Sequence, residues 1–280
     1  MQFEPISVTS RQNPMIQRAA RLDMKKYRDA EGAFLIHGIK LTREAVLHSA
    51  EVELIFVCES AAARIGEALG DLKLPENCRV FAVGESAFAK ISPEKSPDGV
   101  ICVAKTLDKF HKKITIEKRE SDLARQTEGR LLLLESVRDP GNLGTVLRSA
   151  AAFGVDLVVM SVDCADLYHP RTLRAAMGAI FKLPTLRVDD LPSAIGLLQK
   201  NGRRVWAAAL AREAQRLDNL AMEAKDCFLI GNEGHGLSEA AIGAADGAVF
   251  IPMRAHTESL NAATAASVCL WEQARRFGVE

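Results

Sequence analysis

The chain has 280 residues, of which 48% are hydrophobic and 26% charged, and its 36 basic residues balance its 36 acidic residues. This composition can fill one large core or two ordinary ones and excludes a disordered chain, while the zero net charge gives no global sign of a nucleic-acid partner. The six cysteines form no CxxC pair and no apolar run has the length of a membrane span, so we expect no zinc site, no disulfide framework and a soluble cytoplasmic protein.

The first hundred residues predict a small α/β domain, because short apolar strands alternate with helices. We expect strands at 34–36, 54–58, 79–83 and 100–104, and helices at 41–49, 61–69 and 85–91. Ahead of them, residues 8–29 predict a turn and then one amphipathic helix. Basic residues in this region form either a solvated face or a nucleic-acid contact, and both interpretations stay open. They are Arg11, Arg18, Arg21, Lys25, Lys26 and Arg28.

A charged segment then separates two domains. Residues 105–129 hold many charged side chains and few apolar anchors, which is typical of a linker. We therefore predict a first domain at 1–106, a linker at 107–129 and a second domain at 130–280.

The second domain opens with residues 130–160, RLLLLESVRDPGNLGTVLRSAAAFGVDLVVM. Four consecutive leucines predict a strand at 131–134 that is covered on both faces of a parallel sheet. A polar turn at 138–142 and a helix from Leu143 would place Asn142 and Arg148 beyond the carboxyl end of that strand, where α/β proteins bind ligands. We also expect strands at 155–160, 205–209, 227–230 and 248–251, a short apolar piece at 181–183, and helices at 170–177, 190–200 and 259–277.

Two later loops repeat this order of strand, polar glycine-rich segment and helix: FLIGNEGHGLSEAA at 228–241 and VFIPMRAHTESLNAATAAS at 249–267. Glycines in the first let the backbone approach a ligand closely. Glu233 is interpreted equally as a helix cap or a functional group, and His235 as an ordinary exposed loop histidine. Ser259 is expected to cap the terminal helix, and Asn261 in its first turn bonds either backbone or a ligand. One face of that helix suits packing on the core or on a second subunit.

Several common catalytic motifs are absent from the sequence. GNEGHG does not match the GxGxxG dinucleotide fingerprint, and there is no GxxxxGK[ST], GxSxG or HExxH segment. Hydride transfer, nucleoside triphosphate hydrolysis, serine hydrolysis and zinc proteolysis are therefore disfavoured, and no metal site is expected.

The segments DPGNLGTVLRSAAAFG, LIGNEGHGLS and IPMRAHTESLNAATAASVCLWE together resemble the three motifs of the SpoU-type (TrmH-like) RNA 2′-O-ribose methyltransferases of the SPOUT superfamily. The segments TSRQNPMIQRAARL, FLIHGIKLTREA and SPDGV resemble the substrate-binding domain that precedes the catalytic domain in many members. The resemblance implies an α/β methyltransferase domain with a deep trefoil knot after an L30e-like RNA-binding domain, and a homodimer with the terminal helix at its interface.

The resemblance also implies S-adenosylmethionine as cofactor and methyl transfer to a ribose 2′-hydroxyl in RNA. The cofactor-binding positions would be Leu210, Ile230, Gly231, Ile251, Met253, Ser259 and Leu260. The catalytic positions would be Asn142, Arg148, Glu233, Ser259 and Asn261. Because a guanidinium normally stays protonated, we prefer Arg148 as a phosphate clamp and stabiliser of oxyanion charge rather than as the base. Asn142, Glu233 and Asn261 would orient loops, the arginine and the ribose, and the base is left open.

Two features depart from the family pattern. His37 stands where a glutamate is usual, and the balanced charge shifts the expected RNA surface to patches on the N-terminal helix, the linker lysines, Arg171 and Arg174. We favour ribosomal RNA over transfer RNA as substrate. The alternatives are a transfer-RNA methyltransferase, a non-catalytic RNA-binding protein of the same fold, and a small-molecule enzyme that uses another nucleotide.

Overall fold

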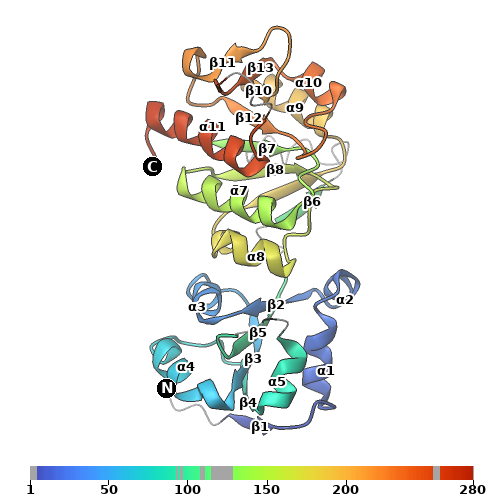
Figure 1. The fold of residues 1–280 in the computed structure, drawn as a ribbon, viewed down its shortest axis with the longest axis vertical. Coiled ribbons are helices and arrows are strands. Elements are labelled where there is room, and N and C mark those ends of the chain that lie inside the picture. The colour runs from blue at the N-terminus through green and yellow to red at the C-terminus, as the bar shows by residue number, and fades with distance from the viewer. Residues whose placement is uncertain are drawn as a thin grey trace. The chain divides into compact units, whose positions relative to one another are not determined.

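The computed structural model describes residues 5–92, 94, 97–107, 111–114, 129–254 and 259–279. The chain divides into two units (Figure 1). The first comprises Met1–Leu107 and Tyr168–Phe181, and the second comprises Asp108–Leu167 and Lys182–Glu280. Residues 168–181 therefore belong with the N-terminal unit, although the chain reaches them from within the second.

The first unit is built on a mixed five-stranded sheet of order β1-β4-β3-β5-β2. Strands β1, β4 and β3 are parallel, and β5 runs antiparallel to both β3 and β2. The strands are β1 (Ile6–Val8), β2 (Ala33–His37), β3 (Val52–Cys58), β4 (Arg79–Val83) and β5 (Val100–Lys105). Four of these were predicted within two residues at each end, and β1 was not.

Helices cover both faces of this sheet, as Figure 1 shows, with α1 and α5 on one side and α3 and α4 on the other. The helices of the unit are α1 (Pro14–Arg21), α2 (Lys25–Glu31), α3 (Ile39–Leu47), α4 (Ala62–Leu69), α5 (Glu85–Ile91) and α8 (Pro170–Ala176). Apolar side chains of α1 and α5 pack with the strands in one core cluster. The first unit is therefore a three-layer α/β domain, which confirms the α/β fold predicted for it.

The prediction of one continuous helix near the N-terminus is wrong, because the chain breaks between α1 and α2. Met24 is extended (φ −94°, ψ 129°) and Leu22 is buried at the break. The buried Arg28 guanidinium donates to the carbonyls of Leu22 (2.9 Å) and Asp23 (2.6 Å), so it satisfies acceptors that a continuous helix would have used. Arg28 is therefore a structural residue and not part of a solvated basic face.

The second unit contains an eight-stranded sheet of order β11-β13-β10-β12-β7-β8-β9-β6 within its described residues, and every pairing in it is parallel. Its strands are β6 (His111–Ile114), β7 (Leu131–Leu134), β8 (Leu157–Ser161), β9 (Thr185–Val188), β10 (Val205–Ala208), β11 (Gln215–Arg216), β12 (Cys227–Ile230) and β13 (Gly247–Phe250). The predicted parallel α/β fold is confirmed for this unit.

Strands β6, β9 and β11 were missed by the sequence patterns. The apolar piece expected at 181–183 is the end of a 3-10 turn, and β9 follows it with Thr185 and Arg187 interrupting its apolar residues. β6 lies inside the predicted linker, whose other residues between 108 and 128 lie outside the described residues.

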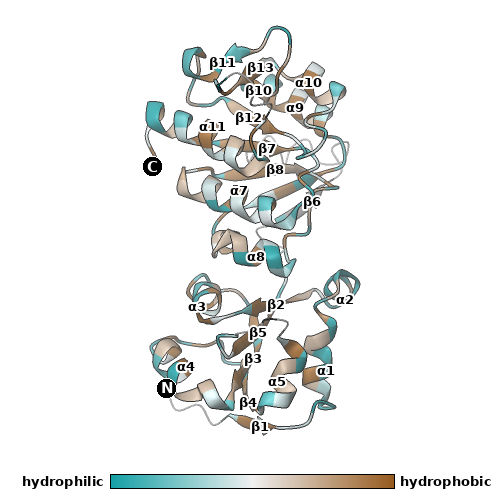
Figure 2. Cartoon of the chain, viewed as in Figure 1, coloured by the Kyte–Doolittle hydropathy of each residue, from teal (hydrophilic) through white to brown (hydrophobic). Residues whose placement is uncertain are grey.

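The helices of the second unit again form two layers (Figure 1): α7 (Pro140–Ala152) and α11 (Ala262–Phe277) pack together, and α9 (Leu191–Lys200) and α10 (Glu239–Ala244) cover the opposite face. Leu131 and Leu133 point into the core under α9 and α10, and Leu132 and Leu134 alternate to the other face. All four leucines are fully buried, which confirms the predicted doubly covered strand. Figure 2 shows the central strands as hydrophobic and the outer helix faces as mixed.

The six cysteines, all in the described part of the chain, are unpaired, as predicted. Burial raises the pKa of Cys102 and Cys269 to about 12, so these thiols are unreactive core residues. In the part of the chain that the structure covers, no helix combines the length and apolar character needed to cross a membrane.

Candidate active site

A cavity of about 390 Å³ opens at the carboxyl ends of the parallel strands β10, β12 and β13. Its wall combines loop backbone with apolar side chains, which is the usual character of a small-molecule site. The structure places all seven expected cofactor residues around it: Leu210, Ile230, Gly231, Ile251, Met253, Ser259 and Leu260.

The loop after β12, residues 231–237, forms one wall of this cavity and is tightly folded. Asn232 and Gly236 exchange two backbone hydrogen bonds of 2.9 and 3.1 Å, and the Asn232 Oδ1 accepts from the N–H groups of Gly234 (2.8 Å) and His235 (3.1 Å). A side chain on Gly231 would place its Cβ 2.5 Å from the carbonyl carbon of Gly236, so only glycine fits there. Asn232 was not singled out from the sequence, although it organises the loop.

Glu233 does not cap the helix that follows it. That helix, α10, is capped by Ser238, whose Oγ accepts from the Ala241 N–H at 3.1 Å. Instead, the Glu233 carboxylate lies at the start of α7, where it accepts from the Asn142 Nδ2 at 3.0 Å and, at a longer 3.4 Å, from the backbone N–H groups of Arg138 and Asp139. Glu233 thus complements a helix N-terminus, but that of a helix about 90 residues earlier in the chain.

Helix α7 begins at Pro140, three residues before the predicted start at Leu143. Asp139 is its N-cap and accepts from the Asn142 N–H at 2.8 Å, and Pro140 occupies the first helical position. Asn142 therefore projects from the first helical turn. The sequence pattern placed it in the polar turn before the helix.

Three of the five expected catalytic residues form a chain of side-chain hydrogen bonds. The Asn142 Nδ2 donates to Glu233, and the Asn142 Oδ1 accepts from the Asn261 Nδ2 at 2.9 Å. The Asn261 Oδ1 then accepts from the N–H groups of Ala263 (2.9 Å) and Thr264 (3.4 Å) in the first turn of α11. A carboxylate at one end and helix N–H groups at the other leave one consistent orientation for both amides.

The remaining two residues stand apart from this chain. Asn261, not Ser259, is the N-cap of α11, so the predicted capping role of Ser259 is wrong; Ser259 lines the cavity. Arg148 is exposed on α7, about 9 Å further along the helix axis than Asn142. Among the described residues it makes no hydrogen bond to the other four.

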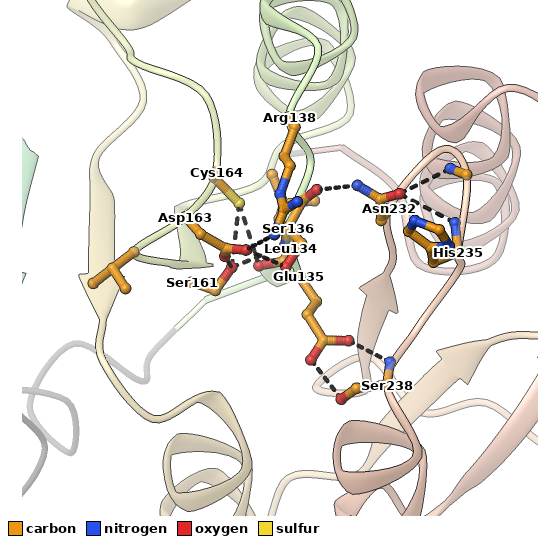
Figure 3. Close-up of polar contacts among 12 residues, drawn as sticks. Leu134, Glu135, Ser136, Arg138, Ser161, Asp163, Cys164, Asn232, His235 and Ser238 are labelled. Carbon is orange, nitrogen blue, oxygen red and sulfur yellow. Dashed lines mark hydrogen bonds and ion pairs between the residues drawn. The ribbon is translucent and has the colours of Figure 1, made fainter.

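A second polar cluster, drawn in Figure 3, fixes the loop between β7 and α7. The carboxylate of Asp163 accepts from the hydroxyls of Ser136 and Ser161, each at 2.6 Å, and from the Arg138 guanidinium at 2.9 Å. Burial tends to raise the pKa of Asp163, but these hydrogen bonds and the charge of Arg138 outweigh it and lower the pKa to about 2. Asp163 is therefore ionised at neutral pH, and the cluster was invisible in the sequence.

The N-termini of α7 and α11 meet at the Asn142–Asn261 hydrogen bond. Their first N–H groups are already bonded, to Asp139 and Glu233 at α7 and to Asn261 at α11. Within the described residues, no group of three or more histidine, cysteine or acidic side chains is arranged to hold a metal ion.

Several of the residues expected to contact RNA lie in the first unit. Arg171 and Arg174 are on α8, and Arg174 is paired with Glu94. His37 ends β2; burial lowers its pKa, and its Nε2 has no hydrogen-bond partner among the described residues. The linker lysines between 109 and 118 have no described side chains.

Comparison with known proteins gives a family match for each half of the chain. Residues 129–271 match the SpoU rRNA Methylase family, and residues 13–102 match the MRM3-like substrate binding domain. The chain is 31% identical to the 23S rRNA (guanosine(2553)-2′-O)-methyltransferase RlmP of Bacillus subtilis, over 94% of this chain and 97% of that protein.

Two solved structures resemble nearly the whole chain. One is a putative RNA methyltransferase of the TrmH family from Porphyromonas gingivalis, with a TM-score of 0.78 and 26% identity over 95% of this chain and 98% of that one. The other is an rRNA methyltransferase from Sinorhizobium meliloti with bound AdoMet, with a TM-score of 0.78 and 26% identity over 97% and 98% of the two chains.

Proposed function

Because the chain belongs to the SpoU rRNA methylase family, we propose that it transfers a methyl group from S-adenosylmethionine to a ribose 2′-hydroxyl of ribosomal RNA. The observation that carries this proposal is the position of Glu233. Glu233 lines the cavity, and its carboxylate accepts a hydrogen bond from Asn142 at the start of α7. The cofactor side and the substrate side of the site therefore meet at one side chain.

The residues around the cavity fit S-adenosylmethionine. Apolar side chains such as Ile230, Met253 and Leu260 offer contacts to a planar base, and loop carbonyl and N–H groups offer hydrogen bonds to its polar edges. When bound, this cofactor supplies an electrophilic methyl group on a cationic sulfur. The protein's task is then to bind and align the ribose hydroxyl and to help its proton leave.

We assign the substrate side to the polar residues at the two helix N-termini. The hydrogen-bonded series Glu233, Asn142 and Asn261 holds these two termini together and so fixes the start of the helix that carries Arg148. We assign Arg148, exposed on α7, to clamp a phosphate and to stabilise negative charge that develops on the ribose oxygen. Ser259, in the cavity wall, contacts cofactor and ribose together in this proposal.

We propose that the first unit recognises the RNA and has an L30e-like fold. Its support is the mixed sheet covered by helices on both faces and the match to a substrate-binding domain over residues 13–102. Residues 1–106, 107–129 and 130–280 would then serve as RNA-binding domain, linker and methyltransferase domain. Residues 168–181 extend the RNA-binding unit, since they are part of the first unit.

A deep trefoil knot near the C-terminus is the second structural proposal. Strand β13 lies beyond β10 in the sheet, yet the chain that follows it returns to pack α11 on α7 and β12. The described residues on either side of 255–258, including Met253 and Ser259, line the cavity, which supports a knotted connection. Tracing the backbone in an experimental structure tests this, because an unthreaded return of residues 251–261 would contradict it.

We further propose a homodimer that uses the outer face of α11. One apolar face of α11, which includes Ala263, Leu270 and Ala274, packs inside the chain because these residues are buried. Trp271, in contrast, is 50% exposed and Val279 is 54% exposed, leaving apolar surface at the end of the chain. Trp271→Glu should convert the dimer to monomer in sedimentation velocity, whereas an unchanged sedimentation coefficient would contradict this interface.

Calorimetric titration with S-adenosylmethionine tests the proposed function most directly. The wild-type protein should bind it, and Gly231→Ala should weaken binding at least about tenfold, because the new Cβ displaces the backbone of the cavity wall. Gly243→Ala is the matched control, since a Cβ at Gly243 in α10 meets no atom within 4 Å. If wild-type protein neither binds S-adenosylmethionine nor methylates ribosomal RNA, the proposal is wrong.

A further inference from the structure

The loop between β7 and α7, residues 135–139, contributes no residue to the cavity wall, yet it leads into the helix that carries Asn142 and Arg148. Two sets of side chains join this loop to loop 231–237. The Glu233 carboxylate accepts from the N–H groups of Arg138 and Asp139 at 3.4 Å, and the Asn232 amide donates to the Ser136 carbonyl at a shorter 2.7 Å. Figure 3 shows the second of these links.

Ser136 uses all of its polar groups at this junction. Its N–H donates to the Ser161 Oγ at 2.8 Å, and its hydroxyl donates to Asp163 at 2.6 Å. Its carbonyl accepts from the Asn232 Nδ2 at 2.7 Å. The backbone of Ser136 is left-handed (φ +54°), a conformation that a non-glycine residue keeps only where its surroundings impose it.

Asn232 uses its other amide atom on the cofactor side. Its Oδ1 accepts from the N–H groups of Gly234 and His235. The same side chain therefore shapes the cavity wall and hydrogen-bonds to Ser136. The far end of loop 231–237 is held by the neighbouring residue Glu135, whose carboxylate accepts from the Ser238 N–H (2.8 Å) and hydroxyl (2.7 Å). Loop 231–237 is thus attached at both ends to the residues that follow β7.

We propose that Asn232 and Ser136 are positioning residues that transmit cofactor binding to the substrate side. Ordering of loop 231–237 around a ligand fixes the Asn232 amide, which fixes Ser136 and thereby the path of the chain into α7. The substrate residues are then presented fully only when the cofactor is in place. This inference rests on the proposed function for the identity of the cofactor.

Hydrogen exchange followed by mass spectrometry, with and without saturating S-adenosylmethionine, tests this coupling in the full-length protein. In wild-type protein we expect the cofactor to slow exchange in residues 231–237 and also in residues 136–142, which do not touch the cavity. Asn232→Asp keeps the oxygen that accepts from Gly234 and His235 but replaces the donor to Ser136 with an acceptor. Slowing at 136–142 should fall about fivefold, as for the loss of one neutral hydrogen bond, while slowing at 231–237 persists.

Asn201→Asp is the matched control, since Asn201 also donates through Nδ2 to a carbonyl, that of Leu197 at 2.8 Å, but in a surface turn away from the cavity. It should behave as wild type. Because Asn232 also lines the cavity, calorimetric titration of Asn232→Asp first sets the S-adenosylmethionine concentration that saturates it, so that weakened occupancy does not produce the expected result. Ser136→Gly, which tolerates the left-handed backbone but loses the bond to Asp163, is a second variant with the same expected pattern.

Each result decides the inference. Slowing confined to 231–237 in wild-type protein, or full slowing at 136–142 in both Asn232→Asp and Ser136→Gly, would overturn the coupling and leave the proposed function intact. Absence of cofactor binding by calorimetry would overturn both.

Discussion

Arg148 is the residue whose placement most sharply separates a functional role from a structural one. Its side chain is exposed on α7, while the buried face of that helix is made by Leu143, Val146, Leu147 and Ala150. Replacing an arginine at such an exposed position changes the free energy of unfolding little. A variant of Arg148 that loses activity but keeps its stability would therefore assign the residue a role in binding or catalysis.

Arg148→Ala should keep the folded structure and lower methyl transfer to ribosomal RNA by about 100-fold or more, because the phosphate clamp and the stabilisation of oxyanion charge are removed together. Arg148→Lys should recover only part of the activity, since an ammonium lacks the planar pair of donors. Transfer of radiolabelled methyl groups measures both variants. Lys200→Ala, which removes a cation from the opposite helix layer, is the control, and near-normal activity of Arg148→Ala would refute the assigned role.

At the scale of secondary-structure elements, the start of α11 was predicted at the wrong residue for a physical reason. Ser259 and Asn261 are both good capping residues, and sequence alone favours the first one met. The structure uses Asn261, which also reaches back to Asn142 with its Nδ2. The choice was decided by an interaction across 119 residues of sequence, which no local pattern contains.

Asn261→Ala should destabilise the second unit by about 1 kcal/mol through loss of the cap, equivalent to a fall of about 2–4 °C in melting temperature. Ser259→Ala should change stability by less than about 0.5 kcal/mol, because the serine caps nothing. Both tryptophans, Trp206 and Trp271, lie in the second unit, so tryptophan fluorescence during heating reports this unit selectively. A larger loss of stability for Ser259→Ala than for Asn261→Ala would reverse the capping assignment.

The loop cluster around Asp163 predicts a pH dependence. Its pKa is about 2 in the folded protein against an ordinary 3.8, so its stabilising effect is complete above pH 3.8 and is lost as the pH falls through about 2. Since 40% of the side chain is exposed, solvent screening limits the effect to about 1 kcal/mol. Asp163→Asn should therefore melt below wild type at pH 5, and the difference should shrink towards pH 2.

Fluorescence melts of the two proteins between pH 5 and pH 2 measure this difference. Glu213→Gln, which removes an exposed carboxylate from the same unit, is the control and should follow the wild type. A difference between Asp163→Asn and wild type that stayed constant down to pH 2 would show that the Asp163 charge does not stabilise the loop.

Strongly periodic elements were the part of the fold that the sequence predicted well. The bounds of β4, α5, β7 and β12 were predicted correctly, because each is a run of apolar or helical residues between clear turn signals. Polar strands such as β9 and β11 were missed because their pairing, not their composition, makes them strands. In the site, motif residues were found, whereas the hydrogen bonds that join Ser136 to Asp163 and Asn232 to Ser136 span 27 and 96 residues, which no local pattern contains.

At the scale of the whole molecule, the structure leaves fewer basic side chains of the N-terminal region available to a partner than the sequence suggests. Arg28 is buried, and Arg18 bonds Glu31 (2.7 Å) and Glu53 (2.8 Å), so neither offers its charge to a partner. Arg21 and Lys26 instead lie over the ring of Tyr27, 5.8 and 4.8 Å from its centroid. This cation–aromatic group can offer both charge and a stacking face to RNA.

Replacing both cations, Arg21→Gln with Lys26→Gln, should weaken binding to total ribosomal RNA and lower the slope of log affinity against log salt by about 1 for each phosphate that the variant no longer neutralises. The affinity for S-adenosylmethionine, which the second unit binds in our proposal, should not change. The double variant Lys200→Gln with Lys225→Gln removes the same charge from the second unit and controls for net charge. An unchanged salt slope in the Arg21 and Lys26 variant, measured by filter binding across salt concentrations, would exclude this group from the RNA surface. A slope reduced equally by both double variants would assign the effect to net charge alone.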